Sequence, residues 1–357
     1  MALPTRPAQL LANMSLETPD PGRAPALSII MSVYNNGRFL NSAIASIRKQ
    51  NFPHFEFLIH DDGSTDDTWS VVQRHAAEDA RIVASHQSNQ GLVRSLNFLL
   101  QKARAPIVAR MDGDDIAHPD RLAKQIALLK AHPNIVALGT QISRIDAQGR
   151  LLSNQAVCPL SHADIMARVS TGLAIAHSSS MFRAEAARRL GGYRQAFKHC
   201  EDLDLWLRLS RVGQLANLPD QLMLYRVHPD QVSAKHSFEQ AMNAAVAQAI
   251  HEGLTGGGRD PLDGCASMPP LDQLAYTTGD SDLPKRVRKK LVASFLANPK
   301  ITKGAGLAHI TQHIAEHDWA DLHATPFLKA IMQLIRGREF RAAFKISWAL
   351  CQKGWLQ

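Results

Sequence analysis

Cysteine and long apolar runs are both scarce in this chain of 357 residues. The cysteines are Cys158, Cys200, Cys265 and Cys351, and no two of them have the Cys-x-x-Cys spacing. Their positions argue against a cysteine zinc site or a disulfide framework, and they suit a reducing compartment. No stretch approaches the roughly 18–20 apolar residues that a membrane span needs. Residues 1–26 lack the apolar run of a signal peptide, so we expect a disordered leader there and a cytoplasmic protein.

The two glycine-rich phosphate-binding motifs are also missing. No Gly-x-Gly-x-x-Gly follows the first apolar segment, and no Gly-x-x-x-x-Gly-Lys-Ser/Thr occurs. These absences exclude a dinucleotide fingerprint and a P-loop. If a nucleotide binds, carboxylates and a metal ion hold it. The first loop, VYNNGRF (33–39), also lacks the glycine-rich sequence expected of a nucleotidyltransferase that makes sugar nucleotides.

Positive charge is concentrated in the last part of the sequence. Residues 281–357 carry 13 Lys and Arg against 5 Asp and Glu, which accounts for the whole net charge of +8. The first 280 residues hold 27 charges of each sign and are neutral. A basic tail raises the alternative of a nucleic-acid-binding protein. We find no zinc finger and no RNP-like aromatic pattern, so we expect no nucleic-acid partner.

The segment LIHDDGSTDD (58–67) crowds four carboxylates into ten residues. Asp-Gly is typical of a turn, because glycine tolerates positive φ and aspartate can bond its own backbone. Ser64 and Asp67 also fit a capping box, which predicts a helix that begins near Thr65 or Asp66. The alternative is a ligand site at the end of a strand, and that interpretation depends on where the neighbouring segments lie.

Apolar patterning predicts alternating strands and helices around this segment. Strands are expected at 27–34, 55–60, 80–87, 106–111, 134–143 and 221–228, and helices at 38–50, 66–78, 91–103, after Pro119 and at 201–213. Such alternation implies an α/β fold with a largely parallel sheet and helices on both faces. Ligands bind at the carboxyl ends of the strands in such sheets. Both DDGSTDD and the acidic cluster MDGDD (111–115) fall at that edge.

The acidic cluster has the composition of a metal site. Asp112, Asp114 and Asp115 repel one another, and burying them unpaired is costly. Mg²⁺ or Mn²⁺ relieves this repulsion and fills its shell with water and phosphate oxygens. A solvated turn before a helix is the alternative. A further pair, Glu201 and Asp202, opens the predicted helix 201–213, where acids complement the helix dipole or one of them serves as a general base.

These segments together resemble the inverting glycosyltransferases of family 2, which have a GT-A fold. The resemblance spans about Ala26 to Ser233 and rests on seven segments in the same order. They are LSIIMSVYNN, FLIHDDGSTDDT, NQGLVRSLN, ARMDGDDIAHPDRL, HSSSMFRAEAARRLGGY, EDLDLWLRL and YRVHPDQVS. Each segment alone is a weak signal, and the shared order makes the match specific.

The resemblance implies a role for particular residues, position by position. It places Ser32 and Tyr34 in the nucleotide pocket, Asp62 at the base with Asp61 beside it, Arg94 near the nucleotide, and His228 near the diphosphate. It makes Asp112 and Asp114 the Asp-x-Asp motif, with Asp114 the direct ligand of Mn²⁺ or Mg²⁺ and Asp115 in support. It makes Asp202 the catalytic base and Glu201 its neighbour.

The implied reaction is a single displacement on a sugar nucleotide, with UDP as the default nucleotide. Asp202 takes a proton from an acceptor hydroxyl as its oxygen attacks the anomeric carbon from the opposite face. The metal offsets charge on the leaving diphosphate. Because many members of this family extend lipid-linked sugars, the resemblance implies a lipid-linked or growing glycan as the acceptor, in cell-surface polysaccharide synthesis. A transferase relative that only binds sugar nucleotides is an alternative, although Asp112, Asp114 and Asp202 are all present.

The remainder of the chain, residues 234–357, is expected to be mainly helical and basic, with a loop near 254–272. KRVRKK (285–290) is a basic cluster. The segment 338–355 puts Phe340, Phe344, Ser347, Trp348 and Cys351 along one helical face. A basic amphipathic helix with aromatics can lie on the inner face of the cytoplasmic membrane. Alternatively, this face packs on the catalytic domain or on a second copy of the chain.

Overall fold

The computed structural model describes residues 24–155, 157–169, 174–231, 235–254, 258–297, 305–316 and 324–352. Most of the expected leader, residues 1–23, lies outside these ranges. The chain divides into two compact units. The first contains residues 1–195 and 201–229, and the second contains residues 196–200 and 230–357. Each unit is described by itself below.

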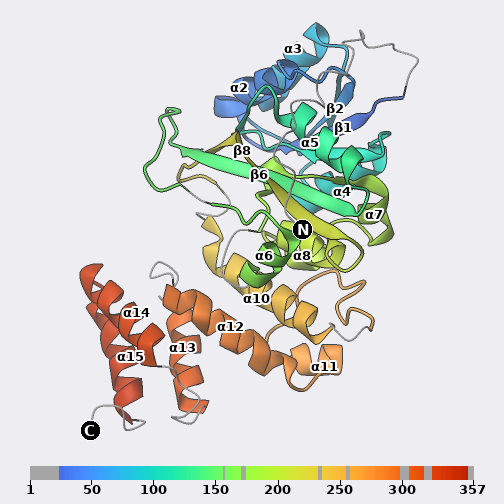
Figure 1. The fold of residues 1–357 in the computed structure, drawn as a ribbon. Helices are drawn as coiled ribbons and strands as arrows, with labels where there is room; N and C mark the ends of the chain where they lie inside the picture. The colour runs from blue at the N-terminus through green and yellow to red at the C-terminus, as the bar shows by residue number, and fades with distance from the viewer. Residues whose placement is uncertain are drawn as a thin grey trace. The chain divides into compact units, whose positions relative to one another are not determined.

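The first unit is built on an eight-stranded sheet, with strand order β3-β2-β1-β4-β7-β6-β8-β5. Strands β3, β2, β1 and β4 run parallel, whereas β7 is antiparallel to both of its neighbours and β5 is antiparallel to β8. The long strands β6 and β8 lie side by side across the sheet (Figure 1) and are parallel. The strands are β1 Leu27–Val33, β2 Phe55–Asp61, β3 Ile82–His86, β4 Ile107–Arg110, β5 Ile116–Ala117, β6 Ile135–Ile145, β7 Met181–Arg183 and β8 Gln214–Arg226.

Helices cover both faces of this sheet, as the alternating pattern predicts. Successive side chains of β1 point to opposite faces. Ile29 joins a core cluster that includes Leu40 and Leu122, whereas Ile30 joins a second cluster that includes Leu96 and Trp206. The α-helices are α2 Gly37–Arg48, α3 Thr68–Glu78, α4 Leu92–Lys102, α5 Arg121–Ala131, α6 His162–Arg168, α7 Ala184–Arg189 and α8 Glu201–Leu209.

The predicted elements are confirmed, and two of their ends differ by four residues or more. Helix α8 ends at Leu209 rather than at residue 213, and Val212 is exposed beyond it rather than buried with Trp206. Strand β8 begins at Gln214 rather than at residue 221, because it pairs with β6 along most of its length. Hydrogen bonding to a neighbouring strand can lengthen a strand beyond the apolar segment from which it is predicted.

The described part of the second unit is helical. Its helices are α10 Ser237–Gly253, α11 Leu274–Thr278, α12 Leu283–Ala297, α13 Ala305–Glu316, α14 Ala324–Arg336 and α15 Phe340–Gln352. Helix α12 packs against α10, α13 and α14, and α15 packs against α13 and α14. Between α10 and α11, the described residues 258–273 form turns and loop. None of the helices described is both long and apolar enough to cross a membrane.

Candidate active site

Three adjacent parallel strands bring the candidate residues to one edge of the sheet. In β1, β2 and β4, which are neighbours, the carboxyl ends lie at Val33, Asp61 and Arg110. Tyr34, Asp62 and Asp112 follow these ends within two residues. The edge is therefore the one at which parallel sheets bind ligands, and the sequence prediction of a shared edge is confirmed.

Asp61 organises the turn that follows β2. Its side chain is fully buried, and its Oδ1 accepts hydrogen bonds from the hydroxyl and the backbone N–H of Ser64. Its Oδ2 lies 2.7 Å from Nδ1 of His86, at the end of β3. These contacts occupy both oxygens with protein groups, so Asp61 fixes the shape of the turn after β2.

Asp62 holds the loop before α4. Its carboxylate accepts hydrogen bonds from the side chain of Gln87 at 2.7 Å and from the backbone N–H groups of Gln90 and Gly91 at 2.9 and 2.8 Å. Its own N–H donates to the carbonyl of Val33 at 2.9 Å. Asp62 thus joins the ends of β1 and β2 to the first turn of α4, which carries Arg94.

The capping-box interpretation of this segment is wrong. Helix α3 begins at Thr68, and the Ser64 hydroxyl donates to Asp61 and accepts from the N–H of Asn35 at 2.9 Å. Asp66 accepts from the N–H groups of Thr68 and Gly37 at 3.0 and 3.1 Å. The polar side chains therefore tie the β2 turn to the loop after β1. The local pattern suggested a helix start, but these long-range partners decide the conformation.

The remaining donor-side candidates differ in exposure. Ser32 is buried in β1, Tyr34 is half exposed, and Arg94 is exposed on α4. An exposed aromatic ring and an exposed guanidinium at this edge are available to a ligand. Their contacts with a nucleotide stay a prediction.

Asp112 is paired with a buried arginine. Arg110, which has no exposed surface, donates from Nη2 to Oδ1 of Asp112 at 2.5 Å. Its backbone N–H donates to Ser180 of the loop before β7, at 2.9 Å. Because the guanidinium is fixed, the Asp112 carboxylate is held at the strand end with about a third of its side chain exposed.

Strand β8 and the residues that follow it supply partners for the other two aspartates. Nε2 of His228 lies 3.0 Å from Oδ2 of Asp114. Oδ1 of Asp115 accepts the backbone N–H of Arg226 at 2.8 Å, next to the β5–β8 pairing. Burial, with the charges of Asp114 and Asp112, raises the pKa of Asp115 well above its usual value. Asp115 is buried and supports the cluster, whereas Asp114 is partly exposed.

The carboxylates that open α8 have raised pKa values. Burial, followed by the charge of Asp202, raises the pKa of Glu201 to about 8. Burial raises the pKa of Asp202 to about 6, and the charge of Asp112 adds to this. Asp112 also contributes to the raised pKa of Glu201. The α8 pair and the acidic cluster are therefore close enough to share one electrostatic environment.

A buried ion-pair network fixes the orientation of α8. Asp204 is almost fully buried and accepts hydrogen bonds from the guanidinium groups of Arg194 and Arg208. Arg208 also donates to the carbonyls of Leu190 and Gly192, both at 2.7 Å. Breaking such a pair leaves an uncompensated buried charge, so the network constrains where Glu201 and Asp202 lie.

Sequence reasoning missed several residues at the centre of the site. Arg121 is buried and donates to the carbonyl of Arg110 at 2.6 Å, and burial lowers its pKa to about 9. Nε2 of His177 lies 3.1 Å from the hydroxyl of Tyr193, and burial lowers the pKa of His177 to about 3. A charged residue in an apolar strand was the available signal for Arg110. No local pattern marks Arg121, His177 or Tyr193.

Comparison with known proteins agrees with this arrangement. Residues 28–191 match the family Glycosyl transferase family 2. The chain is 35% identical over 229 residues to the putative glycosyltransferase EpsE of Bacillus subtilis, which covers 62% of this chain and 80% of that protein. The chain belongs to glycosyl transferase family 2. The resemblance to this family is thereby confirmed, and the protein is a glycosyltransferase.

Other relatives and solved structures extend the comparison. The amylovoran biosynthesis glycosyltransferase AmsE of Erwinia amylovora is 31% identical over 215 residues, covering 59% of this chain and 80% of that protein. The structure of S. aureus TarS 1–349 with UDP superimposes with a TM-score of 0.54 at 15% identity, covering 92% of this chain and 91% of that one. The mannosyltransferase PcManGT from Pyrobaculum calidifontis, with GDP-Man and Mn²⁺, gives 0.50 at 17% identity, covering 97% and 92%. The predicted GT-A fold is confirmed.

Proposed function

We propose that this family 2 enzyme transfers a sugar from a UDP-sugar to a hydroxyl acceptor with inversion, and that Asp202 is the general base. The observation that carries the proposal is that Asp202 lies close enough to Asp112 for the charge of Asp112 to raise the pKa of Asp202. The first is a partly buried carboxylate at a helix start, and the second belongs to the acidic cluster at the sheet edge. A base and a diphosphate-binding cluster on one site are what a single displacement requires.

The protonation chemistry suits this role for Asp202. A general base is most effective when its pKa lies near the working pH. Burial has moved the pKa of Asp202 to about 6, so the carboxylate is mostly ionised at neutral pH and more basic than an exposed aspartate. The pKa of Glu201 is raised to about 8, so Glu201 is mostly protonated at neutral pH and Asp202 is the ionised member of the pair.

The acidic cluster fits a hard divalent cation. The like charges of Asp112 and Asp114 contribute to the raised pKa of Asp115, and this is repulsion that a cation relieves. One oxygen of Asp112 bonds to Arg110 and one oxygen of Asp114 lies next to His228. The cluster therefore offers one or two carboxylate ligands rather than a closed cage. Mg²⁺ and Mn²⁺ are bound in this way, with phosphate oxygens and water completing the shell. When bound, the cation offsets charge on the leaving diphosphate.

The donor pocket is assigned to the turn after β2 and the loop after β1. Asp61 and Asp62 keep these loops in place through their hydrogen bonds, and Tyr34 and Arg94 present an aromatic face and a cation. Both are groups that bind a base and a phosphate. TarS has been solved with UDP and with UDP-GlcNAc, which supports UDP as the nucleotide here.

The acceptor is assigned as a growing or lipid-linked glycan. Support comes from the relatives, since AmsE is named for the biosynthesis of amylovoran and another relative is a chondroitin synthase of Escherichia coli. We assign this chain to cell-surface polysaccharide synthesis on the cytoplasmic side.

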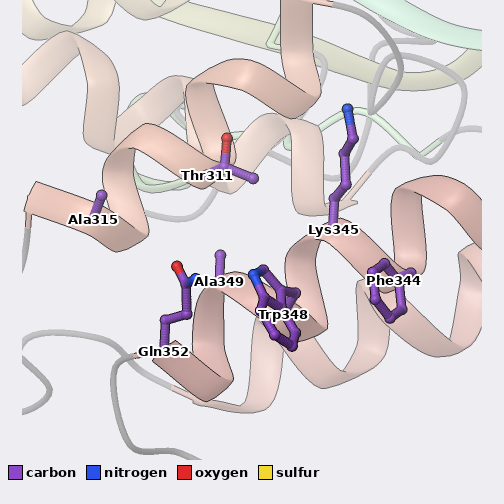
Figure 2. A pocket seen from close by; sticks show the side chains of 7 residues that line it. All are labelled: Thr311, Ala315, Phe344, Lys345, Trp348, Ala349 and Gln352. Atoms are coloured by element: carbon purple, nitrogen blue, oxygen red, sulfur yellow. The ribbon is translucent and has the colours of Figure 1, made fainter.

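The second unit contributes a surface suited to an anionic membrane. On α15, Phe340, Phe344 and Trp348 recur every four residues and are each more than half exposed. The rings of Phe344 and Trp348 stack with centroids 6.1 Å apart, and with Lys345 they line a hollow of about 460 Å³ between α13 and α15 (Figure 2). Exposed aromatics beside basic side chains suit the interface of an anionic bilayer.

Isothermal titration tests the donor site. UDP, GDP and dTDP are titrated into wild type and Asp114→Ala, with and without Mn²⁺. We expect UDP to bind in a Mn²⁺-dependent manner, and we expect Asp114→Ala to lose that dependence. Asp263→Ala, which removes an exposed aspartate of the second unit, is the matched control and should bind as wild type does.

The outcomes separate the parts of the proposal. Preference for GDP or dTDP would keep the transferase site and change the donor. Failure of every nucleotide to bind wild type would overturn the donor site itself. Inversion is checked by NMR of the product anomer in a reaction with an α-linked UDP-sugar, and an α-linked product would contradict the single displacement.

A further inference from the structure

A cluster of two histidines and one glutamate lies in the second unit, outside the residues assigned to glycosyl transfer. It consists of His199, His236 and Glu239, and one ligand atom from each lies within 4.8 Å of the others. His199 belongs to the short segment 196–200, and the other two lie at the start of α10. We propose that this cluster is a binding site for a transition-metal ion such as Zn²⁺.

The distances between the ligand atoms match those around a small cation. Nε2 of His199 lies 3.5 Å from Oε2 of Glu239, and Nδ1 of His236 lies 3.7 Å from the same oxygen. Ligand atoms about 2.0–2.2 Å from a tetrahedral zinc ion are about 3.3–3.6 Å apart. The distances from Oε2 of Glu239 to the two imidazole nitrogens are therefore close to those expected when all three atoms bind one ion.

The backbone holds two of the ligands on one side of a helix. His236 is the residue before α10 and Glu239 is in its first turn, so the pair has the i, i+3 spacing that places side chains on the same face. The third ligand is brought to them by the segment 196–200, where the side chain of Asn243 donates to the carbonyl of Lys198 at 2.8 Å. The site is thus assembled from two segments that already contact each other.

His199 carries two signs of a ligand. Its φ is 65°, a left-handed conformation that is uncommon for a residue other than glycine. Its Nε2 is buried without a hydrogen-bond partner, although a buried imidazole nitrogen normally has one. This nitrogen faces Glu239, and an ion between them would satisfy it.

The ligand chemistry distinguishes this cluster from the acidic one. Imidazole nitrogen suits zinc and other transition metals, whereas Mg²⁺ and Mn²⁺ favour the oxygen ligands that Asp112 and Asp114 offer. Two histidines and a glutamate form a known zinc set that leaves one position for water. His236 and Glu239 are each more than 40% exposed, so the open position faces solvent.

One rearrangement accompanies binding. The imidazoles of His199 and His236 are stacked, with centroids 3.9 Å apart and planes inclined by 17°. Lone pairs of parallel rings do not converge, so one ring must turn about its Cβ–Cγ bond. His236 has the exposed ring and is free of the constraint that burial puts on His199. The bound ion would then clamp the segment 196–200 to α10.

Zinc titration of the full chain tests the site. The protein is stripped with EDTA and titrated with Zn²⁺ in millimolar Mg²⁺, which occupies the oxygen-ligand sites. We expect about one Zn²⁺ per chain, and we expect Co²⁺ at the same site to give the intense visible bands of a low-symmetry nitrogen-ligated ion. His199→Ala and His236→Ala should lose both signals. Glu239→Gln should bind Zn²⁺ more than about tenfold more weakly, since even removing a group that supports a ligand costs about 10–100-fold.

Controls separate loss of a ligand from loss of the fold. His54→Ala removes an imidazole from the first unit and should bind Zn²⁺ as wild type does. Glu239→Gln keeps the size of a half-exposed side chain, so it should fold normally by circular dichroism and retain UDP binding. Unchanged Zn²⁺ affinity in Glu239→Gln and both histidine variants would overturn the proposal, as would the absence of stoichiometric Zn²⁺ binding to wild type. Neither result bears on the donor site.

Discussion

His228 and Asp114 are 114 residues apart in sequence, and Nε2 of His228 lies 3.0 Å from Oδ2 of Asp114. His228 follows the end of strand β8, whose antiparallel pairing with β5 sets Leu224 opposite Ile116 and brings the chain to the acidic cluster. The histidine side chain is 9% exposed and packs against Phe39, with ring centroids 5.0 Å apart. It is therefore well placed to orient the carboxylate that we assign to the metal.

Replacing His228 should weaken metal-dependent nucleotide binding. His228→Ala removes the partner of Asp114, and losing such a supporting group typically costs 10–100-fold in metal affinity. The measurement is the affinity of Mn²⁺ in the presence of saturating UDP, with His132→Ala as the control for loss of an imidazole. Equal Mn²⁺ affinity in His228→Ala and wild type would remove His228 from the donor site.

Asp202→Asn should lower kcat by about 10²–10⁴-fold, the usual contribution of a general base. The amide is nearly the size of the carboxylate, so UDP binding should persist. Because the base acts only when ionised, the wild-type rate should fall as the pH drops through about 6, the raised pKa of Asp202. A pH–rate profile of both proteins checks this. If the variant keeps a full rate and the same acidic limb, another group is the base.

Glu201→Gln should flatten the pH dependence of thermal stability. The pKa of Glu201 is raised by burial from its usual 4.5 to about 8 in the folded chain. The folded state therefore favours the protonated form. That stabilisation is present below pH 4.5 and is lost as the pH rises through about 8. Melting temperatures of wild type and variant from pH 5 to pH 9 measure the difference, and parallel curves would contradict a raised pKa at Glu201.

Gly63→Ala should damage the donor turn, whereas Gly149→Ala should not. Both glycines have φ above +80°, so each alanine carries a backbone cost of about 1–2 kcal/mol. A Cβ on Gly63 would lie 2.6 Å from the backbone nitrogen of Asn89, and a Cβ on Gly149 would meet nothing within 4 Å. The clash adds about 1–3 kcal/mol and displaces the loop that Asp62 holds.

Urea unfolding and UDP titration of these two variants check the prediction. Gly63→Ala should be the less stable of the two and should bind UDP more weakly. If both variants lose equal stability and both bind UDP as wild type does, the close approach at Gly63 has no bearing on the donor site.

Phe344→Ser combined with Trp348→Ser should weaken binding to anionic vesicles by about tenfold or more, because each ring contributes about 1.5–3 kcal/mol when buried. Flotation with anionic and neutral vesicles measures this. The matched control is Tyr276→Ser, which removes an aromatic side chain that is 94% exposed on α11 of the same unit. Unchanged flotation of the double variant would show that α15 does not contact the bilayer.

The α/β fold was predictable because its signals are local. Apolar periodicity marks β1, β2, β4 and the helices between them, and the end of each parallel strand indicates where a ligand site lies. Asp62, Asp112 and Asp202 were selected as candidates by this reasoning together with the family resemblance. The wrong helix start near Thr65 shows the limit of local signals, since the hydroxyl of Ser64 bonds to Asn35 instead.

The tertiary structure alone decided which distant side chains meet. Arg121, His177 and Tyr193 have no local pattern that indicates a role, because their role comes from burial and from partners in other segments of the chain. The same holds for His199 and Glu239, which are 40 residues apart in the chain. Sequence determined the strands, the helices and the acids at their ends. Packing of those elements determined the electrostatic environment of each acid, because a pKa depends on burial and on neighbouring charges in three dimensions.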